Sequence, residues 1–168
     1  MSQFKRIKGD RAWSQPLPER VLIKDIHAID PSQKLNATKS IVIEEGIIAD
    51  ILTTTPENFN GTVISENNAL LFPGLFDMHV HLREPGREDE ETIESGSYAA
   101  ANGGFTGVTC MPNTDPAIDT QEVVNYIKEQ EQSLLVDIFP VAAITKGRKG
   151  SELSPIAELV EAGAGQSS

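Results

Sequence analysis

The chain has 168 residues, 39% of them hydrophobic, enough for one globular domain or for a small domain plus part of a larger one. Its formal net charge of -11 argues against nucleic acid and anionic membrane surfaces as partners. A single cysteine cannot form an internal disulfide, and no stretch reaches the roughly 18 apolar residues that a membrane span needs. A reducing, cytoplasmic setting is therefore expected.

The first part of the chain divides into two segments by composition. Residues 1–16 are polar and lack the apolar segment of a secretory signal, so they are interpreted as an N-terminal tail. Residues 17–70 contain short β-branched runs separated by turn-forming Asp, Asn, Gly and Pro. This spacing predicts a small antiparallel β-module, interpreted as a composite β-sandwich.

Residues 73–86 read PGLFDMHVHLREPG and are the most informative segment of the sequence. A β-strand over residues 75–82 places every second side chain on one face. Two imidazoles at i and i+2 then emerge roughly 6.6 Å apart and can reach one cation, although ordinary half-buried histidines are the alternative. The polar face carries Asp77, His79, His81 and Arg83, and the opposite face carries Phe76, Met78, Val80 and Leu82.

From residue 71 onward the pattern alternates between strands and helices. Strands are predicted at residues 75–82, 106–111 and 134–143. Their centres are spaced by about 30 residues, which is the repeat length of a βα unit with parallel strands. The expected fold class is therefore α/β, with residues 71–168 forming three βα units.

The predicted helices have recognisable ends. The first ends at Gly103 and Gly104, where a positive φ is easily accommodated. Asp119 is expected to cap the second helix, whose buried face includes Tyr126. Ser154 is expected to cap the third.

The segment around the two histidines resembles the first barrel strand of the amidohydrolase superfamily, and within it the dihydroorotase family. The segments GGFT at residues 103–106, CMPNT at 110–114 and TKGRKG at 145–150 strengthen this resemblance, which covers about residues 17–164. It implies the first three units of a (β/α)₈ TIM barrel of a metal-dependent hydrolase. A closed barrel needs about 250 residues, so the chain is expected to be a truncated N-terminal portion, inactive by itself.

The resemblance also implies a chemistry for named residues. His79 and His81 would bind Zn²⁺, one or two ions per complete site, and the ion would activate water. Arg83 and Asn113 would hold the substrate carboxylate. From its place on the strand, Asp77 could reach the metal site, but it is expected to orient a histidine by hydrogen bonding instead. The alternatives are a surface ion pair of Arg83 with Glu84 or Glu88 and a plain turn role for Asn113. The catalytic general base is expected beyond residue 168.

The implied activity is the interconversion of the small molecules N-carbamoyl-L-aspartate and L-dihydroorotate in pyrimidine biosynthesis. A homo-oligomer or a complex with another pyrimidine-pathway enzyme is left open. One competing hypothesis is an allantoinase or hydantoinase, although such substrates lack the ring carboxylate that Arg83 would hold. Another is a non-catalytic scaffold partner. The basic cluster of Lys146, Arg148 and Lys149 could attract an anionic substrate but is interpreted as a solvated loop.

Overall fold

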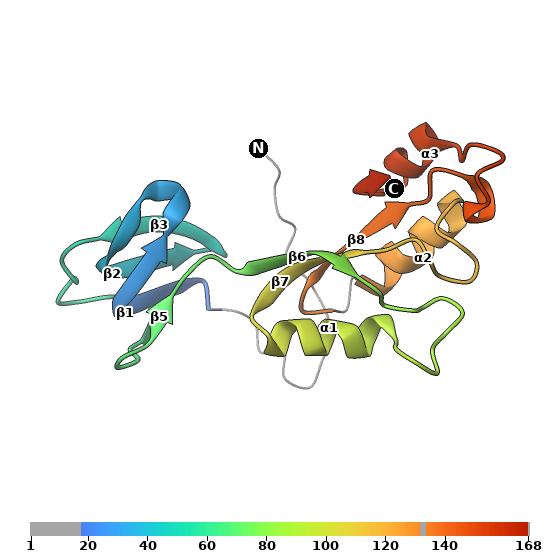
Figure 1. The fold of residues 1–168 in the computed structure, drawn as a ribbon. Helices are drawn as coiled ribbons and strands as arrows, with labels where there is room; N and C mark the ends of the chain where they lie inside the picture. The colour runs from blue at the N-terminus through green and yellow to red at the C-terminus, as the bar shows by residue number, and fades with distance from the viewer. Residues whose placement is uncertain (1–17, 132–133, 168) are drawn as a thin grey trace. The chain divides into compact units, whose positions relative to one another are not determined.

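The computed structural model describes residues 18–131 and 134–167, which form two compact units, residues 18–73 and residues 74–167 (Figure 1). Each unit has a β-sheet of its own. The predicted tail, residues 1–16, lies outside the described residues.

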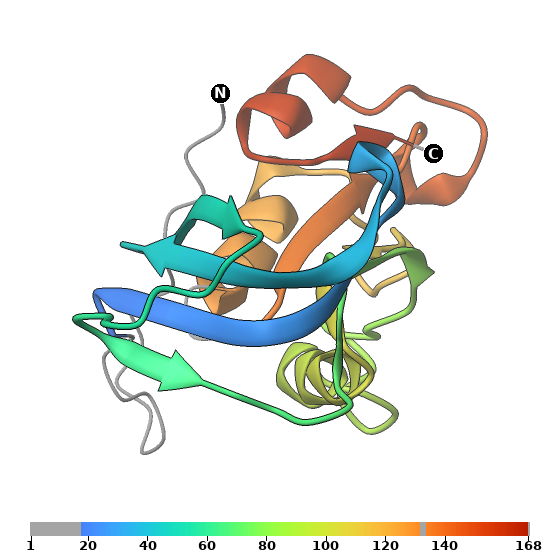
Figure 2. The ribbon, with the colours of Figure 1, turned by 90° about the vertical axis from the view of Figure 1, so that its left-hand side faces the viewer.

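The first unit is built on a mixed sheet. Its strands are β1 (Arg20–Asp30), β2 (Leu35–Glu44), β3 (Ile47–Leu52), β4 (Thr62–Ile64) and β5 (Leu70–Leu71), and the 3₁₀ turn η1 (Pro31–Gln33) joins the first two. Strands β1, β2 and β3 form an antiparallel meander, in which β1 and β2 run side by side as long curved strands (Figure 2). Strands β4 and β5 instead pair parallel with β1, so the predicted antiparallel pairing holds for β1, β2 and β3 and was wrong for β4 and β5. The chain crosses over after β3 and returns along the free edge of β1.

The strands of residues 18–73 form one sheet. A sandwich needs a second sheet packed on the first, so the β-sandwich stays a prediction. The buried side chains of this unit come from its two longest strands. They include Leu22, Ile26 and Ala28 of β1 and Ile41 and Val42 of β2. These strands consequently hold the small core of the unit.

The second unit is a parallel sheet of strands in the order β6-β7-β8-β9, with helices between them. Its elements are β6 (Leu75–Val80), α1 (Ile93–Asn102), β7 (Phe105–Cys110), α2 (Gln121–Glu131), β8 (Asp137–Ala142), the 3₁₀ turn η2 (Lys146–Arg148), α3 (Ile156–Glu161) and β9 (Gln166–Ser167). The sequence indicated only three strands here. A fourth begins at Gln166, because its backbone can pair with Val141 and Ala142 without an apolar side-chain pattern.

One face of this sheet is covered by helices, and the core of the unit lies between the sheet and these helices. Val108 and Cys110 of β7 and Ile138 of β8 pack there against Val124 and Ile127 of α2. All five are at most 2% exposed, and full burial of an aliphatic side chain contributes about 1.5–3 kcal/mol. The helical layer thus fixes the sheet from one side.

Helix α1 forms where it was expected, while the caps of the later helices differ. Gly104 follows α1 with φ +82°, as predicted for the helix end. The carboxylate of Asp119 does not cap α2 but accepts a hydrogen bond from the backbone N–H of Gly147. Ser154 does not cap α3 either, because its hydroxyl is buried without a hydrogen-bond partner among the described residues. Tyr126 projects from α2 with 36% of its surface exposed, so its predicted burial was wrong.

The opposite face of the sheet carries two aromatic rings in contact. The ring centroids of Phe76 and Phe139 lie 5.4 Å apart. Phe139 alternates with the core residue Ile138, so both phenylalanines lie on the face away from the helices. Phe76 was expected on the helix side together with Val80. A register shift between residues 77 and 80 of β6 breaks the simple alternation and explains the difference.

None of the helices in the described part of the chain is long and apolar enough to cross a membrane.

Candidate active site

The two histidines of the His-x-His motif lie at the carboxyl end of β6. His79 is within the strand, and His81 follows directly after its last residue, Val80. The carboxylate of Asp77 accepts a hydrogen bond of 3.0 Å from the backbone N–H of His79. This bond fixes the backbone at the point where the first imidazole leaves the strand.

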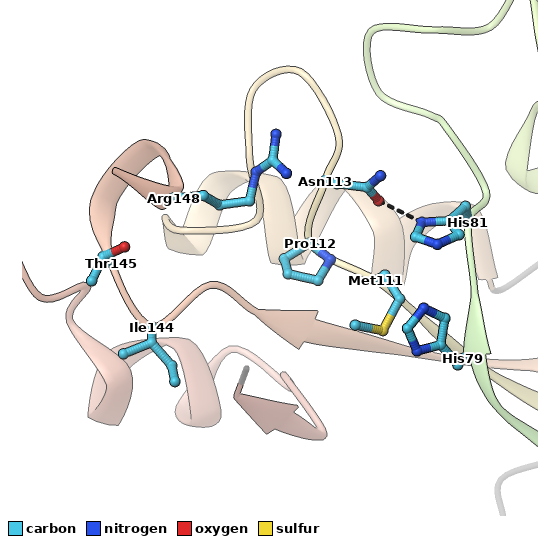
Figure 3. Close-up of a pocket in the computed structure, with 8 residues that line it drawn as sticks. All are labelled: His79, His81, Met111, Pro112, Asn113, Ile144, Thr145 and Arg148. Atoms are coloured by element: carbon cyan, nitrogen blue, oxygen red, sulfur yellow. Dashed lines mark hydrogen bonds between the residues drawn. The ribbon is translucent and has the colours of Figure 1, made fainter. Parts of the chain in front are cut away.

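The imidazoles open into a pocket of about 500 Å³ at the carboxyl ends of three neighbouring strands (Figure 3). Parallel α/β folds place their binding residues at this end of the sheet. The lining residues are His79 and His81 of the β6 end, Met111, Pro112 and Asn113 after β7, and Ile144, Thr145 and Arg148 after β8.

Asn113 and His81 are joined by a hydrogen bond across the pocket edge. The distance between His81 Nδ1 and Asn113 Oδ1 is 2.7 Å (Figure 3). An amide oxygen can only accept, so neutral His81 carries its proton on Nδ1. Its Nε2 therefore keeps the lone pair that a metal ligand needs. Asn113 orients a histidine here, a role that the sequence did not suggest, and its NH₂ group has no partner among the described residues.

The spacing of the two imidazoles fits a shared cation. Their ring centroids lie 5.1 Å apart, with the ring planes at 73°. A tetrahedral Zn²⁺ with bonds of about 2.1 Å to two imidazole nitrogens places the ring centroids roughly 5 Å apart. Residues 18–131 and 134–167 contain no cluster of three or more His, Cys, Asp or Glu side chains that could hold a metal. The described residues thus supply two ligands, whereas catalytic zinc sites use three.

Arg83 lies outside the pocket lining, contrary to the prediction that it shares a strand face with the histidines. The strand has ended three residues earlier, and Arg83 adopts a left-handed backbone with φ +65°. Its Nε lies 3.2 Å from a carboxylate oxygen of Glu90, which also pairs with Arg87. The predicted alternative paired Arg83 with Glu84 or Glu88, whereas the structure shows an ion pair with Glu90 instead.

Glu84 ties the segment after the histidines to two helices. One carboxylate oxygen accepts from the backbone N–H of Ile93 at the start of α1, at 2.7 Å. The other accepts from the hydroxyl of Tyr126 on α2, at 2.5 Å. This hydrogen bond raises the pKa of Tyr126 to about 12. The loop that follows the metal-ligand candidates is consequently anchored on both helices.

Cys110, at the end of β7, is not a candidate ligand. Its side chain is 0% exposed, and this burial raises the pKa of the thiol to about 11. A thiol in such surroundings stays protonated at neutral pH, so it is neither a nucleophile nor a metal ligand.

The loop after β8 contributes one basic residue to the pocket, and sequence reasoning did not single it out. Arg148 lines the pocket, whereas Lys146 forms an ion pair with Glu152. The position of this loop after a parallel strand was the available signal, because such loops build the sites of α/β enzymes.

The sequence profile of a family described as "Dihydro-orotase-like" matches residues 68–166, more than half of the chain. The chain belongs to this dihydroorotase-like family.

Relatives with the name dihydroorotase share high identity with the chain. The dihydroorotase of Acetivibrio thermocellus is 48% identical over 145 residues, which are 86% of this chain and 34% of the relative. That of Aquifex aeolicus is 44% identical over 147 residues, again 86% of this chain and 34% of the relative. The chain thus spans about a third of the length of the relatives it matches.

Solved structures show the same fold at lower identity. An L-hydantoinase (dihydropyrimidinase) from Arthrobacter aurescens matches 88% of this chain and 32% of its own with a TM-score of 0.71 and 23% identity. A D-hydantoinase from a Thermus species matches 84% of this chain and 30% of its own with a TM-score of 0.55 and 25% identity. The arrangement of the elements is therefore shared with part of these enzymes.

Proposed function

We propose that this chain is part of a zinc-dependent dihydroorotase. The observation that carries the proposal is the pair of imidazoles, 5.1 Å apart, in a pocket at the carboxyl ends of parallel strands of a dihydroorotase-like chain. Relatives named dihydroorotase at 42–48% identity support it.

The proposed reaction cleaves one ring bond of L-dihydroorotate. The oxygen of water bonds to the ring carbonyl carbon, the C–N bond between this carbon and the ring amide nitrogen breaks, and the nitrogen takes up a proton. The product, N-carbamoyl-L-aspartate, has gained one carboxylate. The reverse reaction closes the ring with loss of water, as pyrimidine biosynthesis requires.

His79 and His81 are the residues that would hold the zinc ion. When bound, such an ion lowers the pKa of its water to about 7 and polarises a carbonyl group. Asn113 keeps the Nδ1 proton of His81 in place, so that its Nε2 keeps the lone pair that a metal ligand needs. Asp77 holds the backbone of His79.

Arg83 is proposed to bind the carboxylate that the cyclic and open-chain substrates share. A guanidinium matches a carboxylate as a planar fork with two hydrogen bonds. Because Glu90 is its partner in this structure, substrate binding would exchange one carboxylate for another. None of the described residues that line the pocket has a carboxylate, and the general base is proposed to come from outside this chain.

The parallel sheet is proposed to be part of a TIM barrel. Parallel sheets are normally covered on both faces, yet Phe76 and Met78 are 49% and 71% exposed. Further strands would place these side chains in contact with protein.

The test is a substrate panel on the complete enzyme that contains this chain. We expect hydrolysis of L-dihydroorotate, and a loss of at least about 100-fold in kcat for His79→Ala or His81→Ala, because the activated water depends on the ion. His27→Ala is the matched control, since His27 lies in the first unit and its Nε2 bonds to Asn36. Hydrolysis of hydantoin or allantoin, with none of dihydroorotate, would overturn the proposal in favour of the hydantoinase-type alternative.

A further inference from the structure

The pocket has a cationic side chain on the wall that faces the histidines. Arg148 comes from the loop after β8, and Figure 3 shows its side chain extending toward the side of the pocket where Asn113 and His81 lie. Among the described residues that line the pocket, it is the only one that carries a permanent charge. It forms no ion pair with any residue in the described ranges, in contrast to Arg83 and Lys146. An unpaired guanidinium in a pocket is suited to bind an anion.

The loop that carries Arg148 is tied down at several points. The N–H of Gly147 donates to the carboxylate of Asp119, and the N–H of Arg148 donates to the carbonyl of Thr145 at 2.9 Å. The hydroxyl of Thr145 accepts from the N–H of Gly150 at 3.0 Å. The backbone of Arg148, from which its side chain starts, is therefore fixed by hydrogen bonds on both sides of it.

Arg148 itself adopts a left-handed backbone, with φ +59°. This conformation is sterically unfavourable for a non-glycine residue. Glycine would adopt it without that cost, and the neighbouring Gly147 has the same φ. A large basic residue in a strained position, with its side chain in a pocket, suggests that the side chain has a role there.

We propose that Arg148 binds the second carboxylate of the open-chain substrate. This inference rests on the proposed function, in which N-carbamoyl-L-aspartate has two carboxylates and L-dihydroorotate has one. Arg83 would bind the carboxylate that the two compounds share. Arg148 then makes the pocket prefer the dianionic open-chain ureido acid over the monoanionic ring.

The experiment compares Arg148→Asn with Lys149→Asn in the complete enzyme. Asn tolerates the left-handed backbone, so the first variant removes the guanidinium with little change in loop conformation. Lys149 is the matched control, because it lies in the same loop, carries the same charge and does not line the pocket. Two quantities are measured: the product-inhibition constant of N-carbamoyl-L-aspartate and the KM of L-dihydroorotate.

For Arg148→Asn we expect the inhibition constant to rise about tenfold, because one charge-assisted contact is lost. The KM of dihydroorotate should change less than about threefold. Arg148→Lys should recover part of the affinity, and Lys149→Asn should match the wild type. The inference is overturned if the inhibition constant of Arg148→Asn is unchanged, or if the variant loses affinity equally for both ligands. If the wild type hydrolyses dihydroorotate, the proposed function still stands in that case. A wild-type enzyme without this activity overturns both.

Discussion

Asn113 sets the tautomer of His81 by one hydrogen bond. This gives Asn113 a role beyond contact with substrate. The bond of 2.7 Å from Nδ1 leaves Nε2 of neutral His81 unprotonated, with its lone pair free to bind a metal. Partners of this kind orient metal-binding histidines in many sites, and their loss typically lowers metal affinity 10–100-fold. Residue type alone could not predict this role of Asn113, because an Asn after a strand fits a turn as well as it fits a binding site.

Replacing Asn113 by Ala should therefore remove the hydrogen bond that keeps the proton of His81 on Nδ1. We expect the Nδ1–H form to give way to a mixture of tautomers and the affinity for Zn²⁺ to fall about 10-fold or more. Nitrogen NMR of the histidine rings reports the tautomer, and competition with a chromophoric chelator reports the affinity. Asn125→Ala, on the exposed side of α2, serves as the control. An unchanged tautomer in Asn113→Ala would show that the hydrogen bond does not select it.

The hydroxyl of Tyr126 should make stability depend on pH in the alkaline range. Its hydrogen bond to Glu84 raises the pKa from 10.0 to about 12. Because the folded pKa lies above the unfolded one, the stabilisation is fully present below pH 10 and is lost as the pH rises toward 12.

The variant Tyr126→Phe removes this contribution. We expect a loss of about 0.5–1 kcal/mol in the free energy of unfolding at neutral pH, small because the pair is exposed. Urea titrations at a series of pH values should show a steeper alkaline decline for the wild type than for the variant. Parallel curves for the two proteins would mean that the tyrosine titrates alike in the folded and unfolded chain.

At the scale of elements, α1 rests on the segment after the histidines through a glycine. A Cβ built at Gly96 would lie 2.5 Å from Cδ2 of Leu82, which directly follows His81 and is 4% exposed. The helix can approach this closely only because Gly96 has no side chain. Packing at this point thus links the position of α1 to that of the site.

Gly96→Ala tests whether packing or helix propensity dominates. Propensity alone predicts a gain of up to about 1 kcal/mol, whereas overpacking against Leu82 costs about 1–3 kcal/mol. We expect net destabilisation in urea unfolding, with altered NMR shifts for the ring of His81. Ala99→Gly, at an exposed position of the same helix, calibrates the propensity effect. A Gly96→Ala chain more stable than the wild type would contradict the packing argument.

For the molecule as a whole, periodicity was sufficient to predict the order of the first three strands and of the helices in the second unit. It failed where a local break changed the direction of a side chain. The end of β6 at Val80 and the left-handed backbone of Arg83 remove that arginine from the predicted face. The fourth strand was missed because backbone pairing at Gln166 leaves no mark in the hydrophobic pattern.

Only part of the candidate site was predictable from the sequence, because only that part depends on local geometry. The histidines share a short motif, and a β-strand brings them together by its own geometry. The bond between His81 and Asn113 joins residues 32 positions apart, so only the tertiary fold could reveal it. Likewise, three basic residues in one loop are equivalent in the sequence, and only Arg148 among them lines the pocket.

The central claim is that His79 and His81 bind one metal ion together, and equilibrium dialysis against Zn²⁺ tests it most directly. The chain has three histidines, so His27→Ala provides a matched control for the double variant His79→Ala, His81→Ala. We predict that the wild type and His27→Ala bind Zn²⁺ alike, and that the double variant binds it at least about tenfold more weakly. Equal binding by all three proteins would contradict the account and favour a non-catalytic relative of the family.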